Sequence, residues 1–483
     1  NYPAFRSRSG IGLRCPAARS WFSPFIWVTN YGRRYHRSWP SSAKRARDGR
    51  GNIVNESVKH RSNWFYGWTI VAICTVTMTL AYGVRHSFGV FFPPILDEFG
   101  WSRGSTAVML SIHLFVYGSV APFTGALSDR WRAKRMILFG ALVVALATAS
   151  CGFASELWHL YVIFGVFTPI GLAFVGSPLI NPTINNWFFK FRGIAFSLAQ
   201  MGGGLSFLYA IYAESMISAF GWRKAYFVLG VTLFVILVPM LFRFYVYHPR
   251  ERRLEAFGIK GGKPDLGQRP GKIEKQFSWT LKQASRTYQL WSLVISQTLF
   301  WGVGCYLLLA HQVKFAQDMG YSAMFAASTF GFFGISMVIG QVSASISDKI
   351  GRESTLVLGC VLAIGSVFIL TLIRDSSNPW MLYAYAIGFG LGAGLQAPTL
   401  FVGASDLFSG RHFGAINGLI LGGMGVGGAA GPWVGGYIHD LFGSYRYAFG
   451  LSMLCFGLSA IAFVIAAPRR QLRHPSIHPV SSG

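Results

Sequence analysis

The sequence predicts an all-helical membrane protein with twelve transmembrane helices in two pseudo-symmetric six-helix bundles. Three observations lead to this prediction: the composition, the number of long apolar stretches, and a repeat that relates the two halves of the chain. Of the 483 residues, 52% are hydrophobic and only 12% are charged, whereas soluble domains carry about 25% charged residues. Such a composition is typical of a chain that is largely embedded in lipid.

Twelve stretches without Asp, Glu, Lys or Arg are long enough to cross a bilayer, which takes about 20 apolar residues in a helix. In chain order they are Ser62–Val84, Gly104–Ser128, Met136–Phe153, Trp158–Phe189, Ile194–Ala213, Tyr226–Phe242, Thr287–Ala310, Met319–Ser347, Ser354–Ile373, Met381–Ser405, Phe413–Ile438 and Tyr447–Pro468. Most of them contain glycine, which lets helix backbones approach closely in lipid. The glycine-rich run Gly422–Gly431 is therefore expected to be a helix-packing face.

The formal net charge of +26 is compatible with nucleic-acid binding, but the positions of the basic residues favour another explanation. If the N-terminus is cytoplasmic, 22 lysines and arginines fall in the connections after the even-numbered spans and in the C-terminal tail, and six fall on the opposite side. Cytoplasmic loops of membrane proteins carry such an excess. We therefore expect both termini in the cytoplasm, a location in the cell membrane, and no nucleic-acid partner.

The two halves of the chain resemble each other at an offset of about 220 residues. Ser128–Arg130 (Ser-Asp-Arg) recurs as Ser347–Lys349 (Ser-Asp-Lys), and Trp158–Tyr161 recurs as Trp380–Tyr383. Such a repeat predicts two six-helix bundles with a binding site between them near the membrane midplane. The expected organisation is a basic tail at 1–62, bundles at 63–247 and 287–468, a cytoplasmic linker at 248–286, and a cytoplasmic tail at 469–483.

The N-terminal 62 residues do not fit the membrane pattern. Residues 1–61 hold 13 lysines and arginines but two acids, and the first methionine is Met78, inside the first span. We prefer the explanation that this segment lies upstream of the native start. An arginine-rich transit-like presequence and a basic tail on the anionic cytoplasmic leaflet are the alternatives. The segment is expected to be disordered in each case.

The loops after the second and eighth spans carry a shared motif. The first reads Gly125-Ala-Leu-Ser-Asp129-Arg130-Trp-Arg132-Ala-Lys134-Arg135, and the second reads Ser347-Asp348-Lys349-Ile-Gly351-Arg352. They resemble the loop motif of the major facilitator superfamily, although Arg132 stands where that family usually has Gly and Ala344 replaces the first Gly of the second copy. In that family the motif forms a charge latch that stabilises the outward-facing state. The resemblance implies a latch made of Gly125, Asp129, Arg130, Asp348, Lys349 and Arg352, and a solvated basic loop is the alternative.

Further segments resemble one branch of that superfamily, the monocarboxylate transporters and oxalate–formate antiporters. They are Phe65–Trp68, Ser87–Pro93, Glu98–Ser102 and Ala404–Phe408. The resemblance implies a secondary active transporter that moves a small organic anion, a monocarboxylate, by alternating access, either coupled to protons or by exchange. Animal monocarboxylate transporters carry an Asp-Arg pair in helix 8, whereas Met319–Ser347 contains no charged residue. Proton coupling would have to use other groups, such as His86, His311 or Glu214.

Arg85 is the leading candidate for substrate binding. It follows the first charge-free stretch directly, seventeen positions after Trp68, which is about 25 Å along a helix. A charged side chain inside a span is costly and marks a functional site by default. A guanidinium that faces a water-filled cavity can hold a carboxylate through two parallel hydrogen bonds. The alternative is that Arg85 extends to the outer membrane interface.

Three histidines and a tyrosine are further candidates for substrate contact. By the resemblance, His86 aligns with the helix 1 lysine that animal monocarboxylate transporters use for their anion, and a histidine titrates near neutral pH, which suits proton coupling. His113 and Tyr117 are four residues apart in the second span and share a helix face. His311 ends the seventh span and is expected to join an outer gate facing Arg85. For each residue, a purely structural hydrogen bond or interfacial cluster is the alternative.

The sequence indicates no cofactor, no metal site and no enzyme active site. The six cysteines are scattered singly, without zinc or redox spacing, and no nucleophile–base pair is recognisable. Two other functions remain open: a facilitator-type exporter of drugs or amphipathic compounds, and a membrane solute sensor that does not transport. We expect a monomer whose partners are the lipid bilayer, a small organic anion and, in the case of symport, protons.

Overall fold

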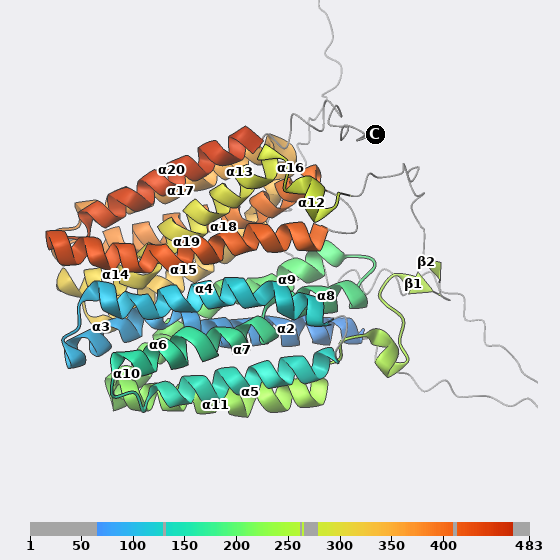
Figure 1. Ribbon diagram of the computed structural model, residues 1–483, viewed down its shortest axis with the longest axis horizontal. Helices are drawn as coiled ribbons and strands as arrows, with labels where there is room; N and C mark the ends of the chain where they lie inside the picture. The colour runs from blue at the N-terminus through green and yellow to red at the C-terminus, as the bar shows by residue number, and fades with distance from the viewer. Residues whose placement is uncertain (1–64, 129–131, 261–262, 265–278, 409–412, 467–483) are drawn as a thin grey trace, which may run out of the picture. The chain divides into compact units, whose positions relative to one another are not determined.

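The computed structural model describes residues 65–128, 132–260, 263–264, 279–408 and 413–466. The chain divides into two units, Asn1–Asn63 and Trp64–Gly483, and all described residues belong to the second. Twelve segments of this unit are long and apolar enough to cross a membrane. Figure 1 shows these helices running alongside one another, and the prediction of an all-helical membrane fold is confirmed.

The first half of the chain contributes six spans, several of which are built from more than one helical segment. Span 1 consists of α2 (Tyr66–His86) and α3 (Phe88–Phe99), span 2 is α4 (Arg103–Ser128), and span 3 is α5 (Ala133–Cys151). Span 4 joins α6 (Leu157–Val162), the π-helix η2 (Ile163–Phe167), α7 (Thr168–Val175) and α8 (Ser177–Trp187). Span 5 comprises α9 (Arg192–Leu205), the 3-10 turn η3 (Ser206–Leu208) and α10 (Tyr209–Phe220), and span 6 is α11 (Trp222–Phe244).

The second half repeats this arrangement. Span 7 joins α13 (Tyr288–Gln297), the π-helix η5 (Thr298–Cys305) and α14 (Tyr306–Asp318). Span 8 consists of α15 (Ala323–Ser343), the turn η6 (Ala344–Ile346) and α16 (Ser347–Ile350). The remaining spans are α17 (Arg352–Leu372), α18 (Pro379–Leu407), α19 (Phe413–Phe442) and α20 (Arg446–Ala466).

Span 1 is longer than its charge-free stretch indicated. It runs past Val84 to Phe99, because the guanidinium of Arg85 is accommodated inside the bundle by a hydrogen bond to His113 and does not end the helix. The helix stops at Gly100, which has a φ of 65°. This left-handed conformation suits glycine and lets the Gly100 N–H bond to a carbonyl of the last turn.

Span 7 also continues beyond its expected end. It runs past Ala310 to Asp318, because Lys314 and Asp318 lie one turn apart and pair with each other at 3.5 Å. The expected break near Gly302 and Gly304 takes the form of the π-helix η5. His311 consequently lies within the helix and not at its end.

Glycines bring the two halves into close contact. A Cβ atom added to Gly118 of α4 would lie only 2.8 Å from the Cα atom of Gly425 in α19. Likewise, a Cβ atom on Gly334 of α15 would lie 2.5 Å from the carbonyl oxygen of Gly204 in α9. Backbones packed this closely need small residues in lipid. The glycine-rich run of span 11 is therefore a packing face, as the sequence predicted.

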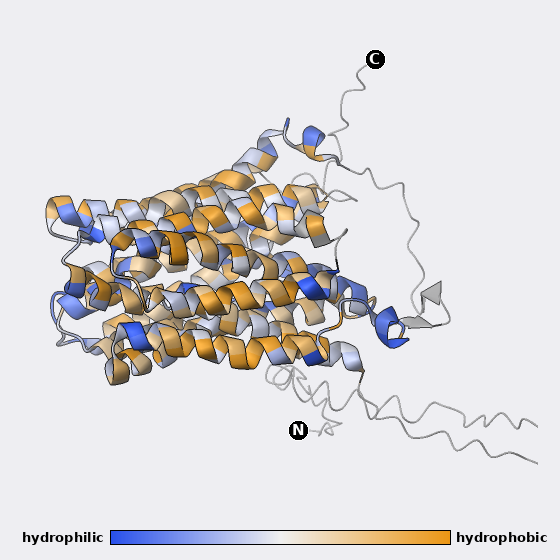
Figure 2. Ribbon diagram, turned by 60° about the horizontal axis from the view of Figure 1, so that its bottom comes forward, coloured by the Kyte–Doolittle hydropathy of each residue, from blue (hydrophilic) through white to orange (hydrophobic). Residues whose placement is uncertain are grey.

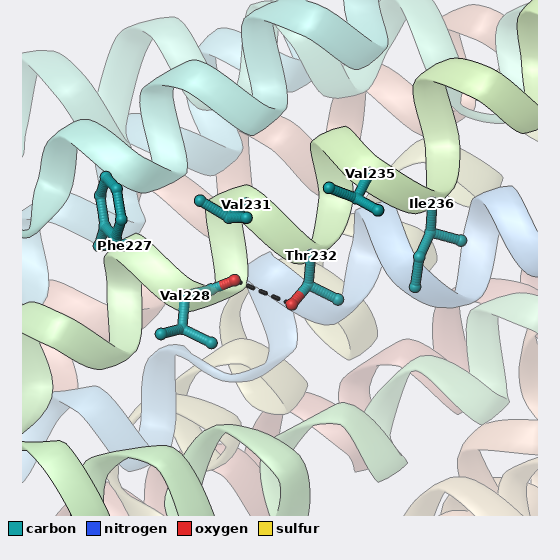
Figure 3. Close-up of a pocket in the computed structure, with 6 residues that line it drawn as sticks. All are labelled: Phe227, Val228, Val231, Thr232, Val235 and Ile236. Carbon is teal, nitrogen blue, oxygen red and sulfur yellow. Dashed lines mark hydrogen bonds between the residues drawn. The ribbon is translucent and has the colours of Figure 1, made fainter.

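Large apolar side chains cover the outside of the spans, and Figure 2 shows hydrophilic residues concentrated near the span ends. On α11, Phe227, Val231 and Val235 are 48%, 42% and 61% exposed. A shallow groove runs along this same helix and is lined by Phe227, Val228, Val231, Thr232, Val235 and Ile236 (Figure 3). Since one outward-facing, apolar helix supplies the whole lining, we interpret the groove as a lipid-facing surface and not as the substrate site.

The linker between the halves is attached to the end of span 4. The N–H of Phe257 donates to the carbonyl of Trp187 at 2.9 Å, and the N–H of Phe189 donates back to the carbonyl of Phe257 at 2.8 Å. The regular elements of the linker are η4 (Pro249–Arg252), β1 (Ile259–Lys260), β2 (Lys263–Pro264) and α12 (Leu281–Ala284), with β1 and β2 antiparallel. The first part of the linker is therefore fixed to the first half.

Candidate functional site

Arg85 lies near the end of α2, in the interior of the bundle. It is 4% exposed and is the one buried lysine or arginine among the described residues. Its Nε atom donates a hydrogen bond of 3.0 Å to Nε2 of His113 on α4. The side chain therefore points into the bundle, and the alternative of an arginine that extends to the membrane interface does not fit its position.

His113 is oriented by the backbone of span 4. Its Nδ1 lies 2.9 Å from the carbonyl oxygen of Phe164, which belongs to the π-helix η2. The widened turn of a π-helix changes the pairing of its carbonyl groups and here presents one of them to a side chain. Because Nδ1–H donates to this carbonyl, Nε2 carries no proton and accepts from Arg85. A neutral His113 thus fixes the orientation of the guanidinium.

Two tyrosines enclose the guanidinium. The Arg85 Cζ atom lies 4.1 Å from the ring centre of Tyr117 and 5.2 Å from that of Tyr82, which are cation–π distances. The two hydroxyl groups are 2.8 Å apart, and the Tyr82 hydroxyl also accepts from the N–H of Ser177 at 3.2 Å. Only glycine at position 176 leaves space for this hydroxyl, because a Cβ there would lie 2.5 Å from it. The sequence predicted Tyr117 but not Tyr82.

One terminal nitrogen of the guanidinium has no hydrogen-bond partner in the described part of the chain. The Nη2 atom of Arg85 is buried and makes no hydrogen bond there. The hydroxyl of Tyr306 on α14 approaches the guanidinium from the second half. No described carboxylate forms an ion pair with Arg85. The site is therefore a buried positive charge that is held by neutral groups and has an open hydrogen-bonding position.

His86 points to a different neighbour from Arg85. Its Nδ1 lies 2.6 Å from the hydroxyl of Ser206 in η3, and its ring stacks on Phe207 at 3.9 Å between centres. The Ser206 hydroxyl in turn donates to the carbonyl of Gly203. His86 thus connects span 1 to span 5 within the first half, and it does not share the hydrogen bonds of the Arg85 site.

Glu214 is the buried acid of span 5. It is 3% exposed, and its Oε1 accepts a hydrogen bond of 3.0 Å from Ser218. The carboxyl makes no ion pair in the described part of the chain. It is therefore a second ionisable group in the first half that lies outside the Arg85 network.

The structure does not bring His311 to Arg85. Its Nε2 donates to the carbonyl of Pro432 in α19 at 2.8 Å, and its Nδ1 lies 3.3 Å from the hydroxyl of Tyr445. Burial raises the pKa of Tyr445, although the charge of Arg103 opposes the effect. The phenol therefore stays protonated and donates to His311, while its oxygen accepts from Arg103 at 3.0 Å.

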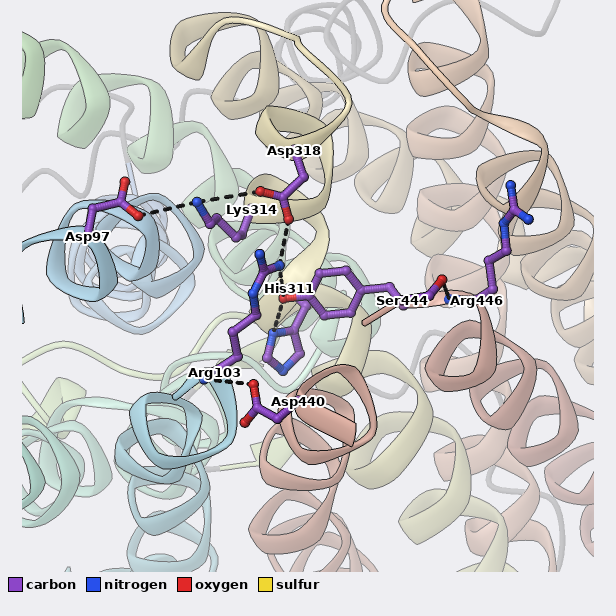
Figure 4. Close-up of polar contacts among 9 residues, drawn as sticks. Asp97, Arg103, His311, Lys314, Asp318, Asp440, Ser444 and Arg446 are labelled. Atoms are coloured by element: carbon purple, nitrogen blue, oxygen red, sulfur yellow. Dashed lines mark hydrogen bonds and ion pairs between the residues drawn. The ribbon is translucent and has the colours of Figure 1, made fainter. Parts of the chain in front are cut away.

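His311 belongs instead to a charged cluster at one end of the bundle, which we call the distal end (Figure 4). Arg103 pairs with Asp318 at 2.6 Å, and Lys314 reaches Asp97 at 3.3 Å. Asp440 accepts from the first two amides of α4, those of Arg103 and Gly104, at 3.1 and 2.8 Å, where the positive end of the helix dipole favours a carboxylate. Each of these contacts joins one half to the other.

Sequence reasoning missed most of this distal cluster. Asp97, Arg103 and Asp440 lie at the ends of spans 1, 2 and 11. In the sequence, Arg103 was counted only as a loop charge that sets the topology, and the two aspartates were not included. These residues could have been predicted from the opposite charges that stand at span ends in the two halves of the sequence.

In the second copy of the expected latch motif, two of the named residues contact each other in the structure. Arg352, at the start of α17, contacts Asp348 at 2.5 Å and Asp406 at 3.0 Å, and it donates to the hydroxyl of Ser347. Lys349 is exposed beside it. In the first copy Gly125 lies in the last turns of α4, while Asp129 and Arg130 lie outside the described residues.

The sequence of the chain is similar to that of known transporters. The profile of the Major Facilitator Superfamily matches residues 71–408 and 368–481. A Homo sapiens protein named Monocarboxylate transporter 11 is 27% identical over 402 residues, which cover 80% of each chain. Monocarboxylate transporter 13 of Bos taurus is 25% identical and covers 80% of this chain and 85% of its own. Monocarboxylate transporter 2 of Homo sapiens is 25% identical, with 80% and 82% covered.

A solved structure has the same fold. It is the crystal structure of a bacterial homolog to the human lysosomal transporter Spinster, in an inward-facing and unoccupied conformation. The TM-score is 0.61 at 17% sequence identity, and the match covers 84% of this chain and 96% of that one. With twelve spans in two similar halves and a profile match over most of its length, the chain belongs to the Major Facilitator Superfamily of membrane transporters.

Proposed function

We propose that the protein is a secondary transporter that moves a small organic anion, a monocarboxylate, across the membrane by alternating access. The observation that carries this proposal is Arg85, a buried guanidinium whose Nη2 atom has no described partner. An isolated charge in a low-dielectric site is costly unless an opposite charge compensates it. A substrate carboxylate supplies that charge and accepts hydrogen bonds from the guanidinium.

The surroundings of Arg85 favour an anion over a cation. His113 accepts the hydrogen bond from Nε of Arg85, and the rings of Tyr82 and Tyr117 lie against the guanidinium. These neutral groups hold the side chain in place without neutralising it, so the Nη2 atom remains available to a carboxylate. The names of the relatives, which are monocarboxylate transporters, support the same substrate class.

The orientation and the conformational state follow from the same proposal. With both termini in the cytoplasm, the distal end faces the outside of the cell membrane, and the structure corresponds to a state closed on that side. Opening then requires separation of Arg103 from Asp318, of Lys314 from Asp97, and of Asp440 from the start of α4. These weak, partly solvated contacts can alternate between two states of the bundle.

Transport is driven either by proton symport or by exchange of one anion for another. The residues of α15 include no charged side chain, so the proton-coupling pair of animal monocarboxylate transporters has no counterpart there. His86 in span 1 and Glu214 in span 5 are the ionisable groups that a proton pathway would use. Uptake measured with and without an imposed pH gradient distinguishes symport from exchange.

The test is uptake of labelled monocarboxylates into proteoliposomes. Arg85→Gln should abolish saturable uptake, because the amide removes the charge. Arg446→Gln is the matched control, since Arg446 is exposed at the start of α20 and its change should leave uptake unaltered. Anion uptake that survives Arg85→Gln, or uptake of cations and amphipathic drugs only, would refute the proposal.

A further inference from the structure

A second group of buried polar side chains lies in the second half. Trp301 in η5 donates its indole N–H to Oε1 of Gln396 in α18 at 2.9 Å. The other amide atom, Nε2 of Gln396, has no described partner, and neither do the Thr399 hydroxyl nor Oε1 of Gln297. Gln396, Thr399 and Gln297 are 0%, 1% and 2% exposed. Buried polar atoms without partners are rare in folded proteins and call for an explanation.

The internal repeat relates this group to the Arg85 site. In the first half, Tyr82 of span 1 bonds to Ser177 of span 4, and in the second half Trp301 of span 7 bonds to Gln396 of span 10. Both members of the pair are displaced by 219 residues, the offset that also separates Ser128 from Ser347. The two polar pairs therefore occupy corresponding places in the two bundles.

Tyr306 lies between the two sites. Its ring centre is 6.4 Å from that of Trp301, and its hydroxyl approaches the Arg85 guanidinium. It is 4% exposed and begins α14 directly after the π-helix η5. A molecule bound at Arg85 and extending toward span 10 therefore passes the Tyr306 side chain.

We propose that Gln396, Thr399 and Gln297 form a second subsite that binds a neutral hydrogen-bonding group of the substrate. The inference rests on the proposed anion transport and narrows its substrate class. The preferred substrate is a monocarboxylate with a hydroxyl, keto or amide group at some distance from the carboxylate. A second carboxylate has no cation to meet here, because the three side chains are uncharged amides and a hydroxyl.

The physical reason for selectivity is the cost of leaving buried polar atoms unpaired. A substrate without the polar group fills the site, excludes water from Nε2 of Gln396 and from the Thr399 hydroxyl, and leaves both atoms without a hydrogen-bond partner. A site built to hydrogen-bond a hydroxyl rejects the analogue that lacks it by a large factor. We expect a preference of at least about tenfold for the polar member of a matched pair.

The experiment compares plain and ω-hydroxylated fatty acids of four, six and eight carbons in proteoliposomes. Wild-type protein should transport the hydroxylated member of at least one pair with a higher kcat/KM. Gln396→Leu and Thr399→Val should reduce this ratio about tenfold, because kcat/KM falls for the hydroxylated acid. Thr399→Val is nearly isosteric and serves where Gln396→Leu does not fold, as judged by size-exclusion chromatography.

Gln312→Leu is the matched control. Gln312 is also buried in span 7, accepts from the Tyr385 hydroxyl at 2.6 Å and has an amide nitrogen without a described partner, but it has no bond to Trp301. Its change should not affect the ratio. Equal transport of both members by the wild type, or a ratio that Gln396→Leu and Thr399→Val leave intact, overturns the subsite while Arg85-dependent uptake still stands. Loss of the anion transport itself overturns both proposals.

Discussion

The Nε atom of Arg85 and the Nε2 atom of His113 are joined by a hydrogen bond of 3.0 Å that links span 1 to span 2. The imidazole accepts this bond because its other nitrogen is committed to the carbonyl of Phe164. A histidine in this role positions the arginine and does not itself need to touch the substrate. In the proposed transporter, Arg85 binds the anion and His113 orients the guanidinium of Arg85.

His113→Leu is expected to weaken substrate binding more than turnover. Loss of the acceptor frees the guanidinium and leaves its Nε–H unpaired, which costs about 1–3 kcal/mol and should raise KM about tenfold or more. His113→Gln keeps an acceptor and should recover part of the affinity. Initial uptake rates over a range of substrate concentrations test this, and an unchanged KM in His113→Leu would contradict the positioning role.

Arg85→Lys should lie between the wild type and Arg85→Gln. The ammonium keeps the positive charge, but it cannot donate to His113 and to a carboxylate with the planar geometry of a guanidinium. We expect measurable uptake with a KM raised by about tenfold. Initial rates of uptake into proteoliposomes over a range of anion concentrations provide the measurement. Equal affinity for Lys and Arg at this position would show that charge alone is sufficient.

Arg103→Gln should loosen the distal end. The Arg103–Asp318 pair is partly solvated, with side-chain exposures of 17% and 26%, so its loss should shift the equilibrium by about 0.2–1 kcal/mol, or up to about fivefold in population. Spin labels at Ser102 and Ser376, exposed residues in different halves, should report longer distances by double electron–electron resonance. Restoration of the short distance in Arg103→Asp/Asp318→Arg would identify the pair as the cause.

Gly425→Val should disrupt the contact between spans 2 and 11. A Cβ atom at this position would lie 2.9 Å from the Cα atom of Gly118, so the two helices must separate, at a cost of about 1–3 kcal/mol. A lower thermal unfolding temperature in detergent is the expected result. Gly450→Val in span 12 is the control, because nothing lies within 4 Å of a Cβ there, and an equal loss of stability in both variants would argue against the close contact.

The fold was predictable because lipid imposes simple requirements. About 20 apolar residues per span and an excess of basic loops can be counted in a sequence, and the repeat at Ser128 and Ser347 indicated two halves. The ends of spans 1 and 7 were not predictable in this way. Arg85 does not end its helix because His113 of another span accepts a hydrogen bond from it, and this partner becomes visible only once the bundle is assembled.

The candidate site was predictable in part. Arg85, His113 and Tyr117 were selected by their charge and helical spacing, and the structure brings them together. Tyr82 was not predicted, because the sequence does not distinguish an aromatic residue at the site from one that faces lipid or packs in the core. His311 was expected opposite Arg85 but lies in the distal cluster with Tyr445, since span 7 extends two turns further than its charge-free stretch.

The hydrogen bonds between Phe257 and the end of span 4 shorten the part of the linker that connects the two bundles. The linker spans residues 248–286, and its residues up to Phe257 are held at the first bundle by these hydrogen bonds. At about 3.3–3.6 Å per residue, the remaining length of the linker can bridge at most about 100 Å. A fluorophore attached before Phe257 should therefore move together with the first bundle, whereas one attached near α12 should move together with the second.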